Sequence, residues 1–307
     1  MTWVGRIVAA AGIVVTVWAC ATGWGAILHG HPLYAVLLAV TVIACVAFGL
    51  RTLRSRRVSS RRRRVVRLVL VVLAVGWIAL MGWLRPFTAT APALAAMVSN
   101  SQVSVTESPT QIVLAPTGAA SQTGVFFQPG AKVEARAYTA ILRPLAAAGY
   151  TVVIPKQPLA IAFLSVGAFD SAKPSFPQIT RWVVGGHSLG GTVAAMEADT
   201  GDTDRTAPVV GLLFFASYPA NGISTSLTAQ VLSISGTDDG LATPASIRAS
   251  QRNLPASTTY IQITGGVHSY FGDYGPQPGD GTPTISHADA RAQISRDSVV
   301  FVNELSK

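Results

Sequence analysis

Hydrophobic residues follow two patterns along this chain of 307 residues. In the first third they form three long and nearly uninterrupted runs, at 7–29, 32–50 and 68–84. A helix needs about 20 apolar residues to cross a bilayer, so these runs predict three transmembrane helices. After residue 110 the apolar residues form short blocks, separated by polar and Gly- or Pro-rich stretches. That second pattern is typical of a globular domain.

Within the globular part, short apolar blocks alternate with segments of helical spacing. The blocks predict strands at 102–106, 111–115, 124–128, 151–155, 181–185, 209–216, 231–235 and 258–264. The helical spacing predicts helices at 133–149, 159–168, 189–198, 243–253 and 286–305. This alternation predicts an α/β fold with a doubly wound, mostly parallel sheet that helices cover on both faces. In such sheets the chemistry lies where strands end.

The two patterns predict three parts of the chain. Residues 1–87 form a membrane domain, in which residues 51–67 are a basic loop between the second and third helices. Residues 88–109 are rich in Ala, Thr, Ser and Pro and are predicted to be a linker that contains the strand at 102–106. Residues 110–307 form the globular domain.

Charge is distributed unevenly between these parts. The first hundred residues hold 11 of the 23 Lys and Arg residues and none of the 14 Asp and Glu residues. Nine of these arginines lie in the loop at 51–67, so the positive-inside rule places that loop in the cytoplasm. Three crossings then put the globular domain on the extracytoplasmic side of a multi-pass cell membrane protein. The first run is longer than a usual signal-peptide core, which favours an uncleaved helix over a cleaved one.

A sequence pI near 10.1 suggests a nucleic-acid ligand. The position of the basic residues between hydrophobic runs argues against it, because such residues determine topology and contact anionic lipid headgroups. We expect membrane lipids, not nucleic acid, as the partner of residues 1–87. Both cysteines, Cys20 and Cys45, lie in the hydrophobic runs, so the globular part has no disulfide framework, Cys-based zinc site or Cys nucleophile. We predict no metal site.

The motif G-x-S-x-G marks the end of the predicted strand 181–185. It reads Gly186-His187-Ser188-Leu189-Gly190 and opens a helix of small residues. A sharp strand-to-helix turn of this kind holds a serine hydroxyl clear of the sheet, and glycines on either side relieve crowding. The sequence therefore predicts Ser188 as a nucleophile, with the N–H of Leu189 as one donor to an oxyanion.

An acid and a histidine follow the serine in the order that a triad on this fold requires. Asp239 comes after the strand 231–235 and is favoured over its neighbour Asp238, which stands closer to the strand. His268 follows the last predicted strand and is the expected general base. His187 adjoins the nucleophile and is expected to point away, and His287 is expected to be exposed near the final helix.

A second oxyanion donor should come from the loop after the strand 124–128. This loop contains Pro129-Gly130-Ala131, and the backbone N–H of Gly130 or Ala131 is the candidate donor. An ordinary Pro-Gly turn is the alternative interpretation.

Together these motifs resemble the α/β-hydrolase superfamily, in particular the small group related to dienelactone hydrolases. The resemblance rests on FFQPGAKVEARAYTAILRPLAAAGYTVVIPK, VVGGHSLGGTVAA, SISGTDDGLAT and GGVHSYFGDYGPQPGD. It implies an esterase-like enzyme that needs no metal or organic cofactor. Pro129-Gly130 departs from the usual His-Gly at the oxyanion loop. Dienelactone hydrolases use a Cys nucleophile, and Ser188 argues against that activity here.

The expected reaction is hydrolysis of a small-molecule or lipid ester through an acyl-enzyme. The stretch 217–228 is too short for a cap domain, which predicts an open site. Tyr270, Phe271 and Tyr274 are expected either to line this site or to pack the loop against the last helix. Two alternatives remain: an acyltransferase on envelope lipids with the same triad, and a non-catalytic binding module.

Overall fold

The computed structural model describes residues 2–54 and 61–306. The chain divides into two compact units, Met1–Pro86 and Phe87–Lys307. Part of the expected basic loop, residues 55–60, lies outside the described residues. We describe each unit by itself.

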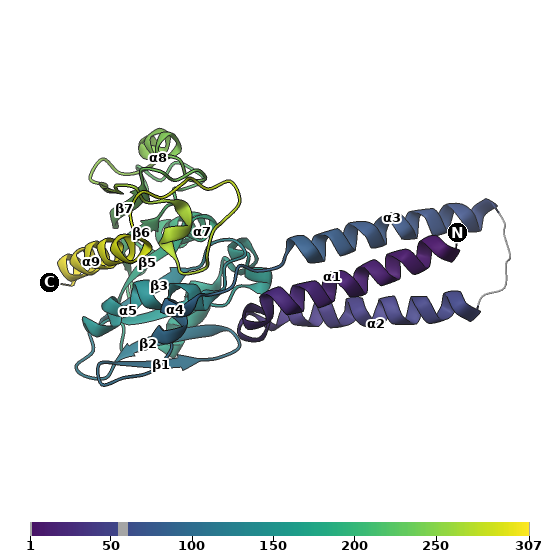
Figure 1. The fold of residues 1–307 in the computed structure, drawn as a ribbon. Helices are drawn as coiled ribbons and strands as arrows, with labels where there is room; N and C mark the ends of the chain where they lie inside the picture. The colour runs from purple at the N-terminus through teal and green to yellow at the C-terminus, as the bar shows by residue number, and fades with distance from the viewer. Residues whose placement is uncertain (1, 55–60, 307) are drawn as a thin grey trace. The chain divides into compact units, whose positions relative to one another are not determined.

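The first unit consists of three long helices that run side by side (Figure 1). They are α1 (Thr2–His29), α2 (Pro32–Arg54) and α3 (Arg61–Trp83). Each contains a segment long and apolar enough to cross a membrane, namely Trp3–His29, Pro32–Arg51 and Arg64–Trp83. α3 begins earlier than the apolar run at 68–84 because arginine is itself a good helix former.

The second unit is built on one sheet of eight strands. The strands are β1 (Val103–Glu107), β2 (Gln111–Pro116), β3 (Thr123–Gln128), β4 (Thr151–Pro155), β5 (Arg181–His187), β6 (Val209–Phe215), β7 (Gln230–Gly236) and β8 (Thr259–Ile263). Their order is β1-β2-β4-β3-β5-β6-β7-β8. β2 pairs antiparallel with both β1 and β4, and all other pairs are parallel. The predicted mostly parallel sheet is confirmed.

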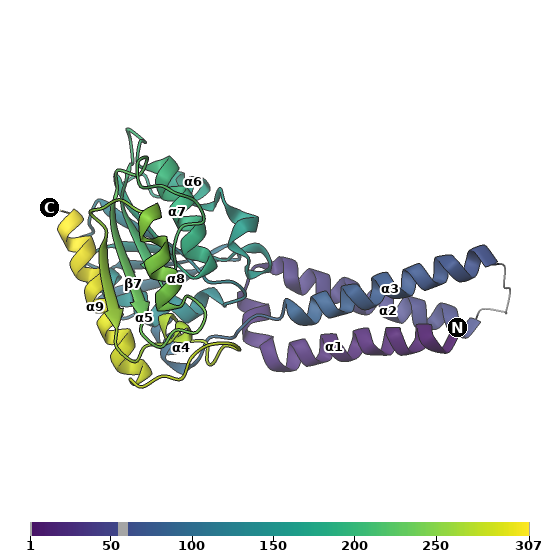
Figure 2. The ribbon, with the colours of Figure 1, turned by 90° about the horizontal axis from the view of Figure 1, so that it is seen from above.

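Helices cover both faces of this sheet. The α-helices are α4 (Ala91–Ala96), α5 (Thr139–Ala147), α6 (Ala168–Ala172), α7 (Leu189–Gly201), α8 (Pro244–Ser250) and α9 (His287–Leu305). Short 3₁₀ turns are η1 (Ala135–Tyr138), η2 (Pro158–Ala160), η3 (Ala162–Ser165), η4 (Lys173–Ser175), η5 (Gln251–Asn253) and η6 (His268–Phe271). α5 and α9 pack together on one face, and α7 lies on the other (Figure 2).

The strands have apolar residues on both sides because each face carries a separate core. Along β3, Val125 and Phe127 join the core under α5 and α9, whereas Phe126 joins the core under α7. β6 repeats this alternation with Leu213 and Leu212. Central parallel strands that are buried on both faces read as continuous apolar runs, which explains why the sequence revealed them.

The segment predicted as a linker, residues 88–109, is instead part of the second unit. It contains α4 and β1, and β1 pairs with β2 along its whole length. Ala93 of α4 is fully buried, and its carbonyl accepts a hydrogen bond of 2.7 Å from the Thr139 hydroxyl. Small Ala and Ser side chains allow this close packing. The composition that suggested a linker therefore belongs to a closely packed edge of the unit.

The single helix expected at 159–168 does not form, although the structure describes all of these residues. The segment forms η2 and η3 instead, followed by α6. Leu159 and Ala160 both have φ of 54°, in the left-handed region, which interrupts a helix. The carbonyl of Ala160 accepts from the backbone N–H of Lys132, so a tertiary contact outweighs the local helical preference.

Candidate active site

Ser188 stands at the turn between β5 and α7, with φ of 52° and ψ of −125°. A non-glycine residue in this region is strained and is held there by its surroundings. Its backbone N–H donates to the Phe215 carbonyl at 3.0 Å, and its carbonyl accepts from the Ser217 hydroxyl at 2.6 Å. The exit of β6 therefore fixes the turn that carries the candidate nucleophile.

Two glycines of the motif have a steric reason to be there. A Cβ at Gly186 would collide with the backbone of Gly190, and a Cβ at Gly190 would collide with the carbonyl oxygens of Gln128 and Pro129. The helix α7 thus starts directly against the end of β3. The G-x-S-x-G turn of the sequence analysis is present as a tight strand-to-helix elbow.

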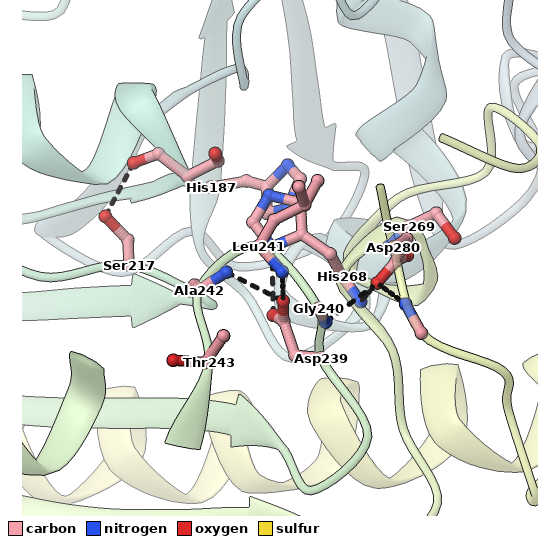
Figure 3. Close-up of polar contacts among 12 residues, drawn as sticks. His187, Ser217, Asp239, Gly240, Leu241, Ala242, Thr243, His268, Ser269 and Asp280 are labelled. Carbon is pink, nitrogen blue, oxygen red and sulfur yellow. Dashed lines mark hydrogen bonds and ion pairs between the residues drawn. The ribbon is translucent and has the colours of Figure 1, made fainter. Parts of the chain in front are cut away.

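Asp239 and His268 form a buried pair (Figure 3). One carboxylate oxygen of Asp239 lies 2.9 Å from His268 Nδ1. The other accepts from the backbone N–H groups of Leu241 and Ala242 at 2.8 and 2.7 Å. Because an ionised carboxylate can only accept, Nδ1 carries the proton and Nε2 is left as an acceptor. The pair thus fixes the tautomer that a general base requires.

Asp238, the alternative acid, faces a different way. Its carboxylate oxygens accept from the hydroxyls of Thr237 and Thr284, each at 3.1 Å. Of the two aspartates, Asp239 is the one that contacts His268.

Asp280 connects the two loops that carry this pair, and sequence reasoning missed it. Its carboxylate accepts from the backbone N–H groups of His268 at 3.0 Å, Ser269 at 2.8 Å and Gly240 at 3.3 Å (Figure 3). Burial raises the pKa of Asp280, but these backbone donors outweigh burial and hold it below its ordinary value. In the sequence it precedes a glycine in a Gly- and Pro-rich loop, which signals only a turn.

His187 differs from the expectation that it points away. Its ring lies against that of His268, with ring centroids 4.5 Å apart. Phe271 stacks near it at 6.1 Å, and Nδ1 lies 2.8 Å from the hydroxyl of Tyr138. Burial, and secondarily His268, lower the pKa of His187 well below its ordinary value. His187 therefore stays neutral beside the ring of His268.

The candidate oxyanion donor Gly130 is already engaged. Its backbone N–H donates to the Tyr138 hydroxyl at 2.8 Å. Because the Tyr138 oxygen accepts from Gly130, its O–H can donate to His187 Nδ1. The side chain of Tyr138 therefore links the loop after β3 to the elbow. Gly130 is thus not free to bind an oxyanion in this state, which leaves Ala131 as the candidate from that loop. Burial raises the pKa of Tyr138, so the phenol stays protonated.

The aromatic residues after His268 serve two purposes. Tyr270 stacks on His287 of α9, with centroids 4.4 Å apart and planes 2° apart. Phe271 and Tyr274 pack beside His187, the latter at 6.0 Å. One of the three therefore packs the loop against the last helix, and two support the site from within. His287 is half-buried, not exposed, and burial lowers its pKa.

The position of Ser188 relative to the His268–Asp239 pair follows from its neighbour. His187, next in the chain, contacts His268, so the pair lies beside the elbow. Nε2 of His268 is buried and has no hydrogen-bond partner in the described part of the chain. No hydrogen bond joins Ser188 to His268 among these residues, a common situation in enzymes without substrate. The described residues also contain no cluster of three or more His, Cys, Asp or Glu side chains suited to a metal ion.

The sequence matches the alpha/beta hydrolase family over residues 124–292, more than half of the chain. The chain belongs to this family. Its match begins in β3 and ends in α9, and so includes the elbow and both loops of the pair. This chain has the eight-stranded, mostly parallel sheet described above. Residues 216–229 join β6 to β7 without a helix or strand, so they form no cap domain.

Solved structures show the same fold. Dienelactone hydrolase from Anabaena variabilis matches with a TM-score of 0.51 and 16% identity, over 67% of this chain and 100% of that one. An esterase from Rhizomucor miehei matches with a TM-score of 0.50 and 13% identity, over 70% of this chain and 86% of that one. No protein with a curated description matches the sequence. These two solved structures share the fold of this chain.

Proposed function

We propose that this chain is a membrane-anchored serine hydrolase that cleaves carboxylic esters through an acyl-enzyme. The observation that carries the proposal is the buried His268–Asp239 pair, whose acceptor nitrogen Nε2 is unpartnered beside the strained elbow of Ser188. Family membership adds support, because the motif, the acid and the histidine follow in the chain order of this fold.

The reaction follows from the roles of the three side chains. His268 Nε2 takes the proton of the Ser188 hydroxyl while the oxygen attacks the ester carbonyl. Asp239 stabilises the charge that His268 gains, and the protonated ring then gives its proton to the leaving alcohol. Water, activated by the same ring, hydrolyses the acyl-enzyme and restores Ser188.

Negative charge on the tetrahedral intermediate is stabilised by backbone donors. Leu189 is the first residue of α7, where N–H groups have no partner within the helix and the helix dipole favours an anion. We assign its N–H as the first donor and that of Ala131 as the second. No metal or organic cofactor takes part in this mechanism.

The three apolar helices supply the anchor. By the positive-inside rule, the arginines of residues 51–67, from the end of α2 to the start of α3, lie in the cytoplasm. Three crossings then put the hydrolase unit on the other side. A reporter fused after Lys307 that is active only outside the cytoplasm is the expected result, and activity only in the cytoplasm would contradict this topology.

The test of the catalytic proposal is labelling of the full chain, purified in detergent, with a fluorophosphonate probe. We expect labelling of the wild type, none of Ser188→Ala, and at least about a thousandfold slower labelling of His268→Ala. The control is Ser257→Ala, which removes an exposed serine hydroxyl of the same unit and should label at the wild-type rate.

The same variants are then assayed with short-chain p-nitrophenyl esters. Hydrolysis that disappears with labelling supports the esterase. A folded wild type that neither labels nor hydrolyses would overturn the proposal and favour a binding module. Labelling without hydrolysis, with acyl transfer to an added alcohol, would point to an acyltransferase.

A further inference from the structure

The membrane unit contains a cavity of about 650 Å³ between its helices. α1 contributes Gly5, Val8 and Ala9, and the remaining walls belong to α2 and α3. The lining is mostly apolar apart from Thr41, Arg51 and Arg67. A cavity of this composition suits a hydrocarbon chain that carries a polar group at one end.

A hydrogen bond joins α2 and α3 near one end of the cavity, and two arginines line the other end. Trp77 Nε1 of α3 donates to the Thr41 hydroxyl of α2 at 2.9 Å. Ala44 lies three residues after Thr41, and Ala74 lies three residues before Trp77, so both stand on the arginine side of this hydrogen bond. Their small side chains leave space between the helices.

The arginines stand at matching heights on the two antiparallel helices. Arg51 lies ten residues after Thr41, and Arg67 lies ten residues before Trp77. At about 1.5 Å per residue, both are about 15 Å from the hydrogen bond. That length equals half of a hydrocarbon core about 30 Å thick, so the cavity spans one leaflet.

The charge of this unit selects an anion. The first hundred residues contain no Asp or Glu, so no carboxylate of the membrane unit neutralises Arg51 or Arg67. A soluble anion would leave the apolar cavity unfilled, whereas an anionic lipid matches both ends. By topology the arginine end faces the cytoplasmic leaflet, where anionic lipids attract such residues.

We propose that the cavity binds one anionic glycerophospholipid of that leaflet. One acyl chain lies between α2 and α3 along Ala44 and Ala74, and the phosphate lies between Arg51 and Arg67. This site lies within the membrane unit and rests on the proposed membrane insertion and orientation of the three helices.

The experiment is native mass spectrometry of the full chain after incubation with micelles that contain equal amounts of phosphatidylglycerol and phosphatidylcholine. We expect the wild type to retain one phosphatidylglycerol, with a preference of at least about tenfold. Arg51→Gln with Arg67→Gln should lower retention on the order of 100-fold, because each charge-assisted hydrogen bond from an arginine to the phosphate contributes on the order of tenfold. The matched control removes the same charge at two arginines that do not line the cavity, Arg62→Gln with Arg64→Gln, and should retain the lipid.

A second variant tests the acyl-chain site without changing charge. Ala44→Phe fills the cavity and should abolish retention while both arginines remain. Equal losses in the two double-arginine variants would overturn the site in favour of diffuse attraction. Equal retention of phosphatidylcholine, or a lipid-free dimer of the wild type, would overturn it as well. Release of the chain from membranes without detergent would contradict membrane insertion itself. That result is distinguishable from failure of the lipid site, in which the chain stays in the membrane but does not retain the lipid.

Discussion

At the scale of single residues, Asp280 joins the loops that carry Asp239 and His268. We expect Asp280→Ala to lower kcat for ester hydrolysis about 100-fold with little change in KM, because an ångström of misplacement of His268 costs about that much. Its loss removes the acceptor for the backbone N–H groups of His268, Ser269 and Gly240. Steady-state kinetics beside thermal unfolding measure this.

The matched control is Asp238→Asn on the neighbouring loop, whose carboxylate contacts only the Thr237 and Thr284 hydroxyls among the described residues. It should keep kcat within about threefold of the wild type. If Asp280→Ala raised KM and left kcat unchanged, Asp280 would not position His268. A loss of kcat that tracks the unfolded fraction would mean that its role is purely structural.

The sequence predicted correctly that Asp239, and not Asp238, contacts His268, whereas the catalytic roles of these residues and of Ser188 stay predictions. Ser188 lies in a motif of five residues, and Asp239 and His268 each follow a buried strand, so parallel topology predicts that they meet. Asp280 and Tyr138 act through contacts made 12 and 49 residues away along the chain, with His268 and His187. Nothing in their local sequence distinguishes them from turn and core residues.

At the scale of elements, a buried carboxyl group ties α7 to the end of β3. Glu197 of α7 accepts from the Gln128 amide at 2.8 Å, and burial raises the pKa of Glu197 to about 8. In the unfolded chain this group ionises near 4.5. The folded state therefore binds more protons between these values, so its stability falls as pH rises from about 4.5 to about 8.

Glu197→Gln removes this dependence. We expect the variant to match the wild type at pH 5 and to exceed it at pH 9 by on the order of 3 kcal/mol, about 10 °C in Tm. Thermal unfolding at the two pH values measures the difference. The control is Glu304→Gln, at an exposed position near the end of α9. The difference in Tm between this variant and the wild type should be the same at pH 5 and at pH 9. A Glu197→Gln variant no more stable than wild type at pH 9 would contradict a protonated Glu197.

Elements were predictable wherever burial alone decides them. The strands from β3 to β8 are apolar blocks between two cores, and their predicted bounds lie within about two residues of those observed. Prediction failed at 159–168, where a backbone contact between Lys132 and Ala160 replaces the helix. It also failed at 88–109, where small residues pack closely and do not form a flexible linker.

At the scale of the whole molecule, the boundary of the hydrolase unit lies at Phe87 and not near residue 110. The backbone N–H of Phe87 donates to the Lys132 carbonyl at 2.6 Å, and that of Ala89 donates to the Glu134 carboxylate at 2.9 Å. β1 covers the free edge of β2, which would otherwise expose unpaired backbone groups that promote aggregation.

We therefore expect a fragment of residues 87–307 to be soluble and folded and one of residues 110–307 to aggregate or to lose at least about 10 °C in Tm. A third fragment, 98–307, keeps β1 but lacks α4, and its Tm should lie between the two. Size-exclusion chromatography and thermal unfolding distinguish them. A 110–307 fragment as soluble and as stable as 87–307 would show that residues 88–109 are a tether after all. The expected intermediate Tm of the 98–307 fragment would show that α4 and β1 each stabilise the unit separately.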